Sequence, residues 1–268
     1  MANLVKIYKS GYSKGSKSEK TSKVIALDLD ETLGEFSALV ALWQCSTSQE
    51  FSDFCIILDC FPEFMRCGIM TIMEYLYKKK QKGHCSRIFL YTNNRYSPNF
   101  PQLITHYFSE KMGGDLFDKT ICAFKVGDKI IEPERTSHQK THGDFIKCTL
   151  LPKSTEICFI DDVYHENMNT DKIYYIQPFQ YYHALSAEDI VERAVKMMPK
   201  YFPDKSMLVA KLSNRHYHVS PDYEIHTKVS QKIMYYIKEF FYLTTLKPKT
   251  RKHLKKTGKH SRKDYLPK

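Results

Sequence analysis

The stretch KVIALDLDETLGEF, from Lys23 to Phe36, starts as an apolar run and then places two aspartates two residues apart. The run Val24–Leu27 is too short for a helix and rich in aliphatic side chains, which predicts a buried strand. Carboxylates are costly to bury unless something pairs with them, so Asp28 and Asp30 at the end of such a strand need a reason. This placement indicates a functional site.

Three more apolar runs predict buried strands, and amphipathic segments between the runs predict helices. The strands are Ile88–Tyr91, Ile157–Ile160 and Ile173–Ile176, and the helices are 62–79, 98–112, 141–150 and 186–198. Thr141 and Ser186 are residue types that cap helix N-termini. Strands that alternate with helices predict an α/β fold with a parallel central sheet and helices on both faces.

Polar residues follow three of the predicted strands. Asp28 follows the first, Thr92 the second, and the pair Asp161 and Asp162 the third. Because ligands of parallel α/β sheets bind at the carboxyl ends of the strands, we expect these side chains to meet at one edge of the sheet.

The chemistry that fits such an edge is phosphoryl transfer through a carboxylate. One aspartate can attack a phosphate monoester while a second protonates the leaving oxygen and later activates water. Residues i and i+2 of an extended segment point the same way, so Asp28 and Asp30 can serve one substrate. Mg²⁺ would offset the repulsion between carboxylate and phosphate, held by Asp28, the main-chain carbonyl of Asp30 and an acid from the third strand end, which either Asp161 or Asp162 could supply directly.

Four segments together resemble the haloacid dehalogenase (HAD) superfamily of phosphotransferases over roughly residues 22–180. ALDLDETL is similar to its first motif, RIFLYTNN to its second and EICFIDDVYH to its fourth. The segment DKTICAFKVGDKIIEP…QKTHGDFIKC resembles the small sheet insert that precedes the family lysine. Glu31 is typical of the NLI-interacting-factor-like phosphatases, which include the small phosphatases of the RNA polymerase II C-terminal domain.

The resemblance implies a HAD-like (Rossmannoid) sheet and a role for each motif residue. It implies that Asp28 is the nucleophile, Asp30 the general acid and base, and Thr32 the residue that orients Asp30. It implies phosphate binding by Thr92, Asn93 and a lysine, and metal binding on the side of Asp161 and Asp162. Lys140 precedes the predicted cap Thr141 at a helix N-terminus, where anions are favoured. We favour it over Lys147, which lies mid-helix.

The chain also differs from the family pattern. It has Asn93-Asn94 where the protein phosphatases usually have Ala-Ser, and Asp162 where they usually have Asn. Residues 33–60 have room only for a flap, so we expect a small or absent cap and an open site. An open site suits a macromolecular phosphate. The Lys- and Tyr-rich composition is similar to that of members encoded by large DNA viruses.

The net charge of +11 is concentrated at the two ends of the chain. Residues 1–23 hold six lysines and one glutamate, residues 247–268 hold ten cations and one aspartate, and residues 24–246 sum to −3. We predict disordered basic segments at 1–23 and 247–268. They could bind nucleic acid, an acidic partner or an import receptor, or be solvated tails without a partner.

Between the tails we predict two further units. Residues 24–200 form the phosphatase domain with a hairpin insert at 119–132, and residues 201–246 form a helical extension packed on the core, its longest helix opened by Ser220-Pro221. No apolar run is long enough to span a membrane, and no signal-peptide core is visible. Eight scattered cysteines without a C-x-x-C pair favour a reducing intracellular setting, cytoplasm or nucleus, or host cell or virion for a viral protein.

The leading hypothesis is a Mg²⁺-dependent phosphatase of phosphoserine or phosphothreonine in a protein. Alternatives are a phosphatase of nucleic-acid ends or small phosphoesters, and a binding or virion-associated protein on an inactive HAD scaffold. Weaker candidates are a metal-binding pair at His216 and His218, Trp43 at the site entrance, and reactive thiols at Cys122 and Cys148. For Trp43 we favour burial, and neither cysteine has a basic neighbour of the kind that marks a reactive thiol.

Overall fold

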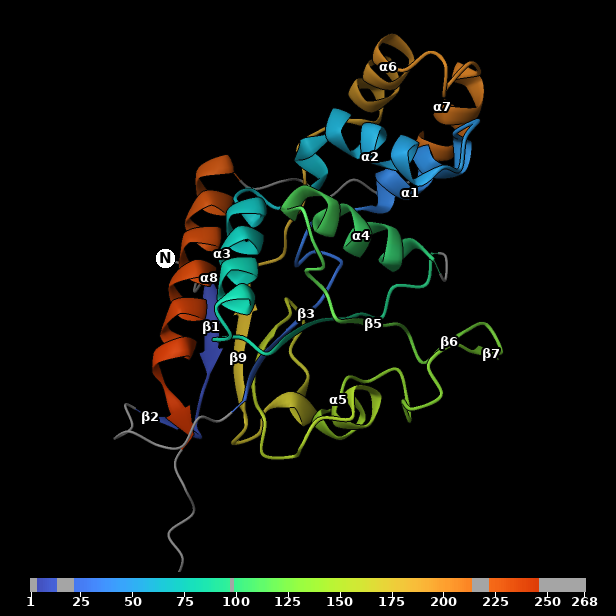
Figure 1. The fold of residues 1–268 in the computed structure, drawn as a ribbon. Coiled ribbons are helices and arrows are strands. Elements are labelled where there is room, and N and C mark those ends of the chain that lie inside the picture. The colour runs from blue at the N-terminus through green and yellow to red at the C-terminus, as the bar shows by residue number, and fades with distance from the viewer. Residues whose placement is uncertain (1–3, 14–21, 97–98, 214–221, 246–268) are drawn as a thin grey trace, which may run out of the picture.

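A six-stranded, mostly parallel sheet lies at the centre of the computed structural model, which describes residues 4–13, 22–96, 99–213 and 222–245 (Figure 1). Five strands run parallel and the edge strand β1 runs antiparallel. The predicted α/β class is therefore confirmed. In spatial order the strands are β1 (Val5–Tyr8), β9 (Ile173–Pro178), β8 (Glu156–Ile160), β3 (Lys23–Leu27), β4 (Arg87–Tyr91) and β5 (Lys119–Ile121).

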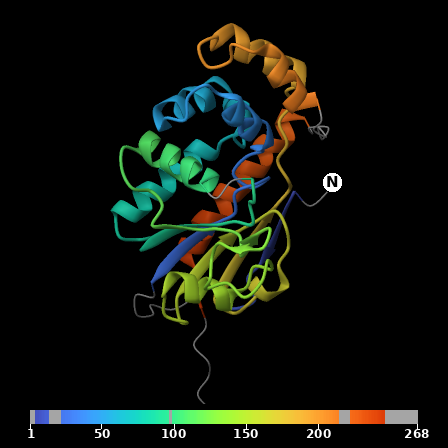
Figure 2. The same ribbon diagram turned by 90° about the vertical axis from the view of Figure 1, so that its right-hand side faces the viewer.

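Helices cover both faces of this sheet, as predicted (Figures 1 and 2). Successive strand residues point to opposite faces, so Val24 and Ala26 of β3 join one apolar cluster while Ile25 and Leu27 join the other. The first cluster is covered by α5 (His142–Thr149) and the short helix η2 (Glu166–Met168); the second is covered by α3 (Ile69–Gln81), α4 (Phe100–Met112) and α8 (Tyr223–Tyr242).

Four helices form a lobe beyond α4 (Figure 1). They are α1 (Ser37–Cys45), α2 (Phe51–Cys60), α6 (Ala187–Met197) and α7 (Lys205–Ser213), with α7 packed on α1 and α6. Residues 33–60 therefore make two helices rather than only a flap. The predicted extension 201–246 is split between α7 in this lobe and α8 on the sheet. Trp43 is buried against Phe54, as favoured.

The N-terminal segment differs from its prediction. Val5–Tyr8 is an edge strand paired with β9, and β2 (Tyr12–Ser13) pairs with β10 (Thr244–Thr245). The predicted disorder of residues 1–23 is therefore wrong for this part. Val5 and Ile7 alternate with Lys6 and Tyr8 and give the strand an apolar side, although the segment 1–23 has a net positive charge. Residues 14–21 and the predicted tail 247–268 lie outside the described residues.

Two predicted boundaries also differ. The helix expected from residue 62 begins at Ile69, after a short 3₁₀ helix η1 (Pro62–Phe64), because Gly68 has a left-handed φ of 76° that a helix interior does not allow. In the expected insert 119–132, the first three residues join the main sheet as β5. Only β6 (Lys125–Val126) and β7 (Lys129–Ile130) make the hairpin, turning at Gly127 with φ 56°.

Other helix ends agree with the sequence. The Thr141 hydroxyl accepts a hydrogen bond from the Asp144 amide at the start of α5, and Ser186 forms a capping box with Asp189 at the start of α6. Ser220-Pro221, expected to open α8, lies outside the described residues. Within the described part of the chain, none of the helices combines the length and apolar character that crossing a bilayer requires.

Candidate functional site

Three aspartates meet at the carboxyl edge of the sheet. Asp28 follows β3, and Asp161 and Asp162 follow β8, which pairs with β3 in parallel. One carboxylate oxygen from each lies within 4.8 Å of those of the other two, and the residues are only 8 %, 0 % and 6 % exposed. The predicted convergence of these strand ends is confirmed.

Lys140 lies between two of these carboxylates. Its Nζ is 2.5 Å from Oδ1 of Asp28 and 2.6 Å from Oδ2 of Asp161, and the residue is buried. It directly precedes the cap of α5, the position that favoured it in the sequence. Lys147 is exposed on the same helix. Lys140 is therefore the lysine that belongs to the acidic cluster.

The cluster carries more negative than positive charge. Burial raises the pKa of Asp28 well above its usual range, opposed by Lys140 and reinforced by Asp161 and Asp162. Burial and Asp161 also raise the pKa of Asp162. For Asp161, attraction to Lys140 and a contact with His165 outweigh burial and lower the pKa. One ammonium cannot offset three neighbouring carboxylates.

This donor set fits a metal ion. Asp28, Asp161 and Asp162 each offer a carboxylate oxygen, and oxygen ligands suit hard divalent cations such as Mg²⁺. A divalent cation would also supply the charge that Lys140 alone does not. The three side chains could therefore hold a metal ion at this edge.

Asp30 is held separately from this cluster, by Asn94. The Asn94 Nδ2 donates to both carboxylate oxygens of Asp30, at 3.1 and 2.9 Å. Burial, partly offset by this amide, raises the pKa of Asp30 to about 6. Asn93, which the sequence predicts as a phosphate-binding residue beside Thr92, accepts a hydrogen bond at its Oδ1 from Arg135.

The alternation of an extended chain is the signal that could have selected Asn94. Thr92 and Asn94 are two residues apart and so share a side. Thr92 is fully buried directly after β4, and its hydroxyl oxygen accepts a hydrogen bond from the main-chain N–H of Asn94. Arg135 stabilises the segment Thr92–Asn94 by donating a hydrogen bond to the main-chain carbonyl oxygen of Thr92, at 3.0 Å.

Thr32 has a different partner from the expected one. Its hydroxyl donates to Oδ1 of Asp162 at 2.9 Å and accepts from the Asp162 amide at 3.0 Å. Thr32 therefore orients Asp162 rather than Asp30. The reason is the turn at Glu31, whose φ of 53° lies in the left-handed region and redirects the chain between Asp30 and Thr32.

Sequence reasoning missed Arg66, a buried residue behind this turn. Its guanidinium donates to the carbonyl oxygens of Glu31, of Thr32 at 2.6 Å, and of Phe179 at 2.9 Å. Arg66 thus links residues 31–32 by hydrogen bonds to Phe179, which directly follows β9. Gln180 in that segment after β9 donates to Oδ2 of Asp162, at 3.1 Å. No motif at Arg66 revealed this role, since its partners are main-chain atoms.

A second link between the same segments is the pair of Glu35 and His183. Oε2 of Glu35 is 2.7 Å from Nε2 of His183, and Oε1 accepts from the Ser37 amide. Burial opposes ionisation of Glu35, but these contacts outweigh it and lower the pKa. A carboxyl whose pKa falls on folding contributes stability above its unfolded pKa, about 4.3. That contribution is lost as the pH falls through the folded pKa.

We therefore expect Glu35→Gln to lower the free energy of unfolding by about 1–2 kcal/mol at pH 7. The difference from the wild type should shrink between pH 7 and pH 3, because the stabilisation is lost as the pH falls toward the lowered pKa of Glu35. Urea unfolding at both pH values measures it. Glu74→Gln, which removes an exposed glutamate paired with Lys78, is the matched control and should change little at either pH. An equal loss at both pH values would show that the Glu35 charge is not involved.

The remaining candidates from the sequence are the histidine pair and the two cysteines, and the described residues give neither a functional role. His216 and His218 lie outside them. All eight cysteines are free thiols, and burial raises the pKa of Cys122 and raises that of Cys148 to about 12, the opposite of a reactive thiol.

Comparisons with known proteins add no assignment. No protein-family model matches the sequence, and neither the search of curated proteins nor that of solved structures finds a match.

Proposed function

We propose that the chain is a Mg²⁺-dependent phosphomonoester hydrolase of the HAD type, acting as a protein serine/threonine phosphatase. The observation that supports this most is the buried group of Asp28, Asp161 and Asp162 with Lys140 between two of its members. Asp30 lies outside that group, with a pKa of about 6. A bound Mg²⁺ would favour the ionised form of Asp28, as a nucleophile requires, while the raised pKa of Asp30 suits a carboxyl that carries a proton as general acid.

In the proposed reaction, Oδ of Asp28 attacks phosphorus and the bond from phosphorus to the leaving oxygen breaks. Asp30 gives its proton to that oxygen, which leaves as an alcohol. Water then attacks the aspartyl-phosphate, Asp30 takes a proton from it, and the Asp28 carboxylate and inorganic phosphate are released. Bound Mg²⁺ would neutralise phosphate charge during both displacements.

The other residues position these groups. Lys140 holds Asp28 and would attract the phosphate. Asn94 orients the carboxylate of Asp30 by a hydrogen bond, and Thr32 orients that of Asp162. The Thr92 hydroxyl accepts a hydrogen bond from the main-chain N–H of Asn94. We propose that it in turn donates a hydrogen bond to a phosphate oxygen of the substrate.

Metal removal tests the proposal directly. With EDTA, hydrolysis of p-nitrophenyl phosphate should fall by on the order of 100-fold or more, because the metal contributes several kcal/mol to transition-state stabilisation. Excess Mg²⁺ should restore it. Turnover that is unaffected by EDTA would contradict a metal-dependent site.

Substrate class is tested by comparison. Phosphoserine and phosphothreonine peptides should be hydrolysed with a higher kcat/KM than 3′- or 5′-phosphorylated oligonucleotides or small phosphoesters. The opposite ranking would assign the site to nucleic-acid ends. No turnover of any of these would favour a binding protein on an inactive scaffold.

A further inference from the structure

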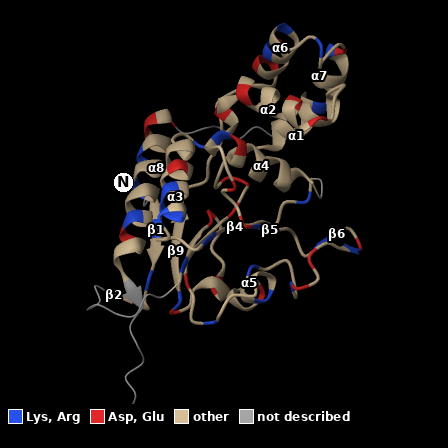
Figure 3. Cartoon of the chain, viewed as in Figure 1, with Lys and Arg blue, Asp and Glu red and all other residues tan. Residues whose placement is uncertain are grey.

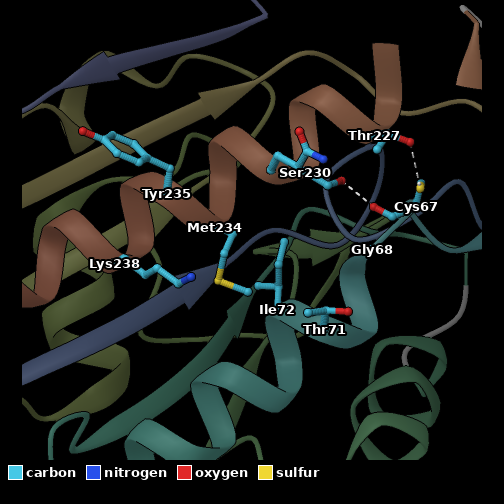
Figure 4. A pocket seen from close by; sticks show the side chains of 10 residues that line it. Cys67, Gly68, Thr71, Ile72, Thr227, Ser230, Met234, Tyr235 and Lys238 are labelled. Carbon is cyan, nitrogen blue, oxygen red and sulfur yellow. Dashed lines mark hydrogen bonds between the residues drawn. The ribbon is translucent and has the colours of Figure 1, made fainter. Parts of the chain in front are cut away.

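Helices α3 and α8 lie side by side over one face of the sheet (Figure 1). A surface groove lies between them (Figure 4). The groove encloses about 410 Å³. Its walls include Thr71 and Ile72 from α3 and Met234, Tyr235 and Lys238 from α8, and none of its lining residues is acidic.

The two helices are basic in a part of the chain that is otherwise acidic. With Lys82, α3 holds four lysines and one glutamate, and α8 holds three lysines and two glutamates, a joint +4. Residues 24–246 as a whole carry −3. Figure 3 shows the lysines of α3 and α8 on this side of the molecule. These two helices therefore carry a local excess of positive charge that residues 24–246 as a whole do not.

Four of these lysines have no acidic partner within ion-pair distance among the residues that the structure describes: Lys79, Lys82, Lys232 and Lys238. Lys79 lies over the rings of Tyr75 and Phe241, 5.4 and 5.1 Å from their centroids, and Lys238 lies 5.7 Å from that of Tyr75. Their charge is available to an external anion.

Exposed aromatic rings lie among these lysines. Tyr235 is 62 % exposed and Tyr242 is 85 % exposed. Positions 235, 238 and 242 share one side of α8, because residues three, four and seven apart on a helix are neighbours in space. Flat rings between cations are the arrangement on which unpaired bases stack while lysines contact the phosphates.

We propose that this α3–α8 face, defined by Lys79, Lys232, Tyr235, Lys238 and Tyr242, binds single-stranded nucleic acid. Phosphates lie against the three lysines and bases stack on the two tyrosines. The chain after α8 strengthens the case, since residues 247–268 add ten cations and one acid beyond Thr245. The face is built from elements other than the aspartate cluster, so the inference does not depend on the proposed hydrolytic activity.

The test is fluorescence anisotropy of the full chain with a labelled oligothymidylate of about 20 nucleotides. Each phosphate contact contributes about 0.7 to the slope of log K against log salt for single strands. The triple substitution K79Q/K232Q/K238Q should therefore reduce that slope by about 2 and weaken binding roughly 10- to 100-fold at about 0.1 M salt. Tyr235→Ala should weaken binding about fivefold or more through lost stacking.

The matched control is K153Q/K196Q/K205Q, which removes the same charge from exposed lysines elsewhere. It should weaken binding by less than about threefold. Equal weakening by the two triples, or unchanged binding by the first, would assign binding to net charge or to the C-terminal segment and overturn the proposal. Binding to anionic phospholipid vesicles without binding to the oligonucleotide would overturn it in favour of a membrane surface. Thermal melts of both triples verify that each variant is folded.

Discussion

Asp28→Asn is expected to reduce hydrolysis of p-nitrophenyl phosphate by about 10⁴-fold or more, because it removes the proposed nucleophile while keeping the shape of the side chain. Asn can still accept a hydrogen bond from Lys140, so the cluster around it should stay in place. The measurement is the steady-state rate with saturating Mg²⁺. As a control, Asp59→Asn changes an exposed aspartate that binds Tyr107 and Lys111, and its turnover should match the wild type.

The same substitution should not destabilise the fold. Burial and the neighbouring acids raise the pKa of Asp28, so its charged form is disfavoured in the folded chain. A carboxyl whose pKa rises on folding costs stability once the pH exceeds its unfolded pKa. Asp28→Asn removes this cost, so in the absence of Mg²⁺ its melting temperature at pH 7 should equal or exceed that of the wild type. If Asp28→Asn hydrolyses p-nitrophenyl phosphate at a tenth of the wild-type rate or faster, Asp28 is not the nucleophile.

Arg66→Met is expected to lower the free energy of unfolding by about 3 kcal/mol or more. It removes a buried guanidinium and leaves the carbonyl groups of Glu31, Thr32 and Phe179 without their donor, each at a cost of about 1–3 kcal/mol. Urea unfolding measures the loss. Arg66→Lys should recover only part of it, since one ammonium cannot match the planar fork of a guanidinium.

Arg66 should also affect the metal through Asp162. Thr32 and Gln180 hold the two oxygens of Asp162, and Arg66 joins the segments on which they lie. We expect weaker Mg²⁺ binding by calorimetry in folded Arg66→Lys. Arg193→Met is the matched control, because Arg193 is partly exposed and pairs with Glu63; it should cost less than about 1 kcal/mol. Equal losses for the Arg66 and Arg193 variants would show that the turn at Glu31 does not need this support.

The sequence predicted the parts of the site that depend on strand ends. Asp28, Asp161 and Asp162 could be placed together because each follows an apolar run, and parallel strands end at one edge. Lys140 could be preferred because Thr141 has the chemistry of a helix cap. These inferences need only local patterns and one rule of topology.

What the sequence did not predict depends on contacts between distant segments. Thr32 pairs with Asp162 because Glu31 adopts a left-handed conformation, which no composition rule assigns to glutamate. Arg66 binds carbonyl oxygens, which every residue carries, so nothing in the sequence marks its partners. The strand Val5–Tyr8 gives only a weak sequence signal, because the net charge of residues 1–23 hides its short alternation of apolar and polar residues. Its pairing with β9 is a contact with a distant segment.

That N-terminal strand has a consequence for synthesis of the protein on the ribosome. Val5–Tyr8 is synthesised before the other strands of the sheet, yet its partner β9 is the last of them in sequence, and the partner of β2 follows α8. The nascent chain must therefore carry β1 as an unpaired strand until β9 has been made, a state in which such strands are open to wrong pairing. Chaperones that shield emerging polypeptides should matter more for the yield of this chain than its modest size suggests.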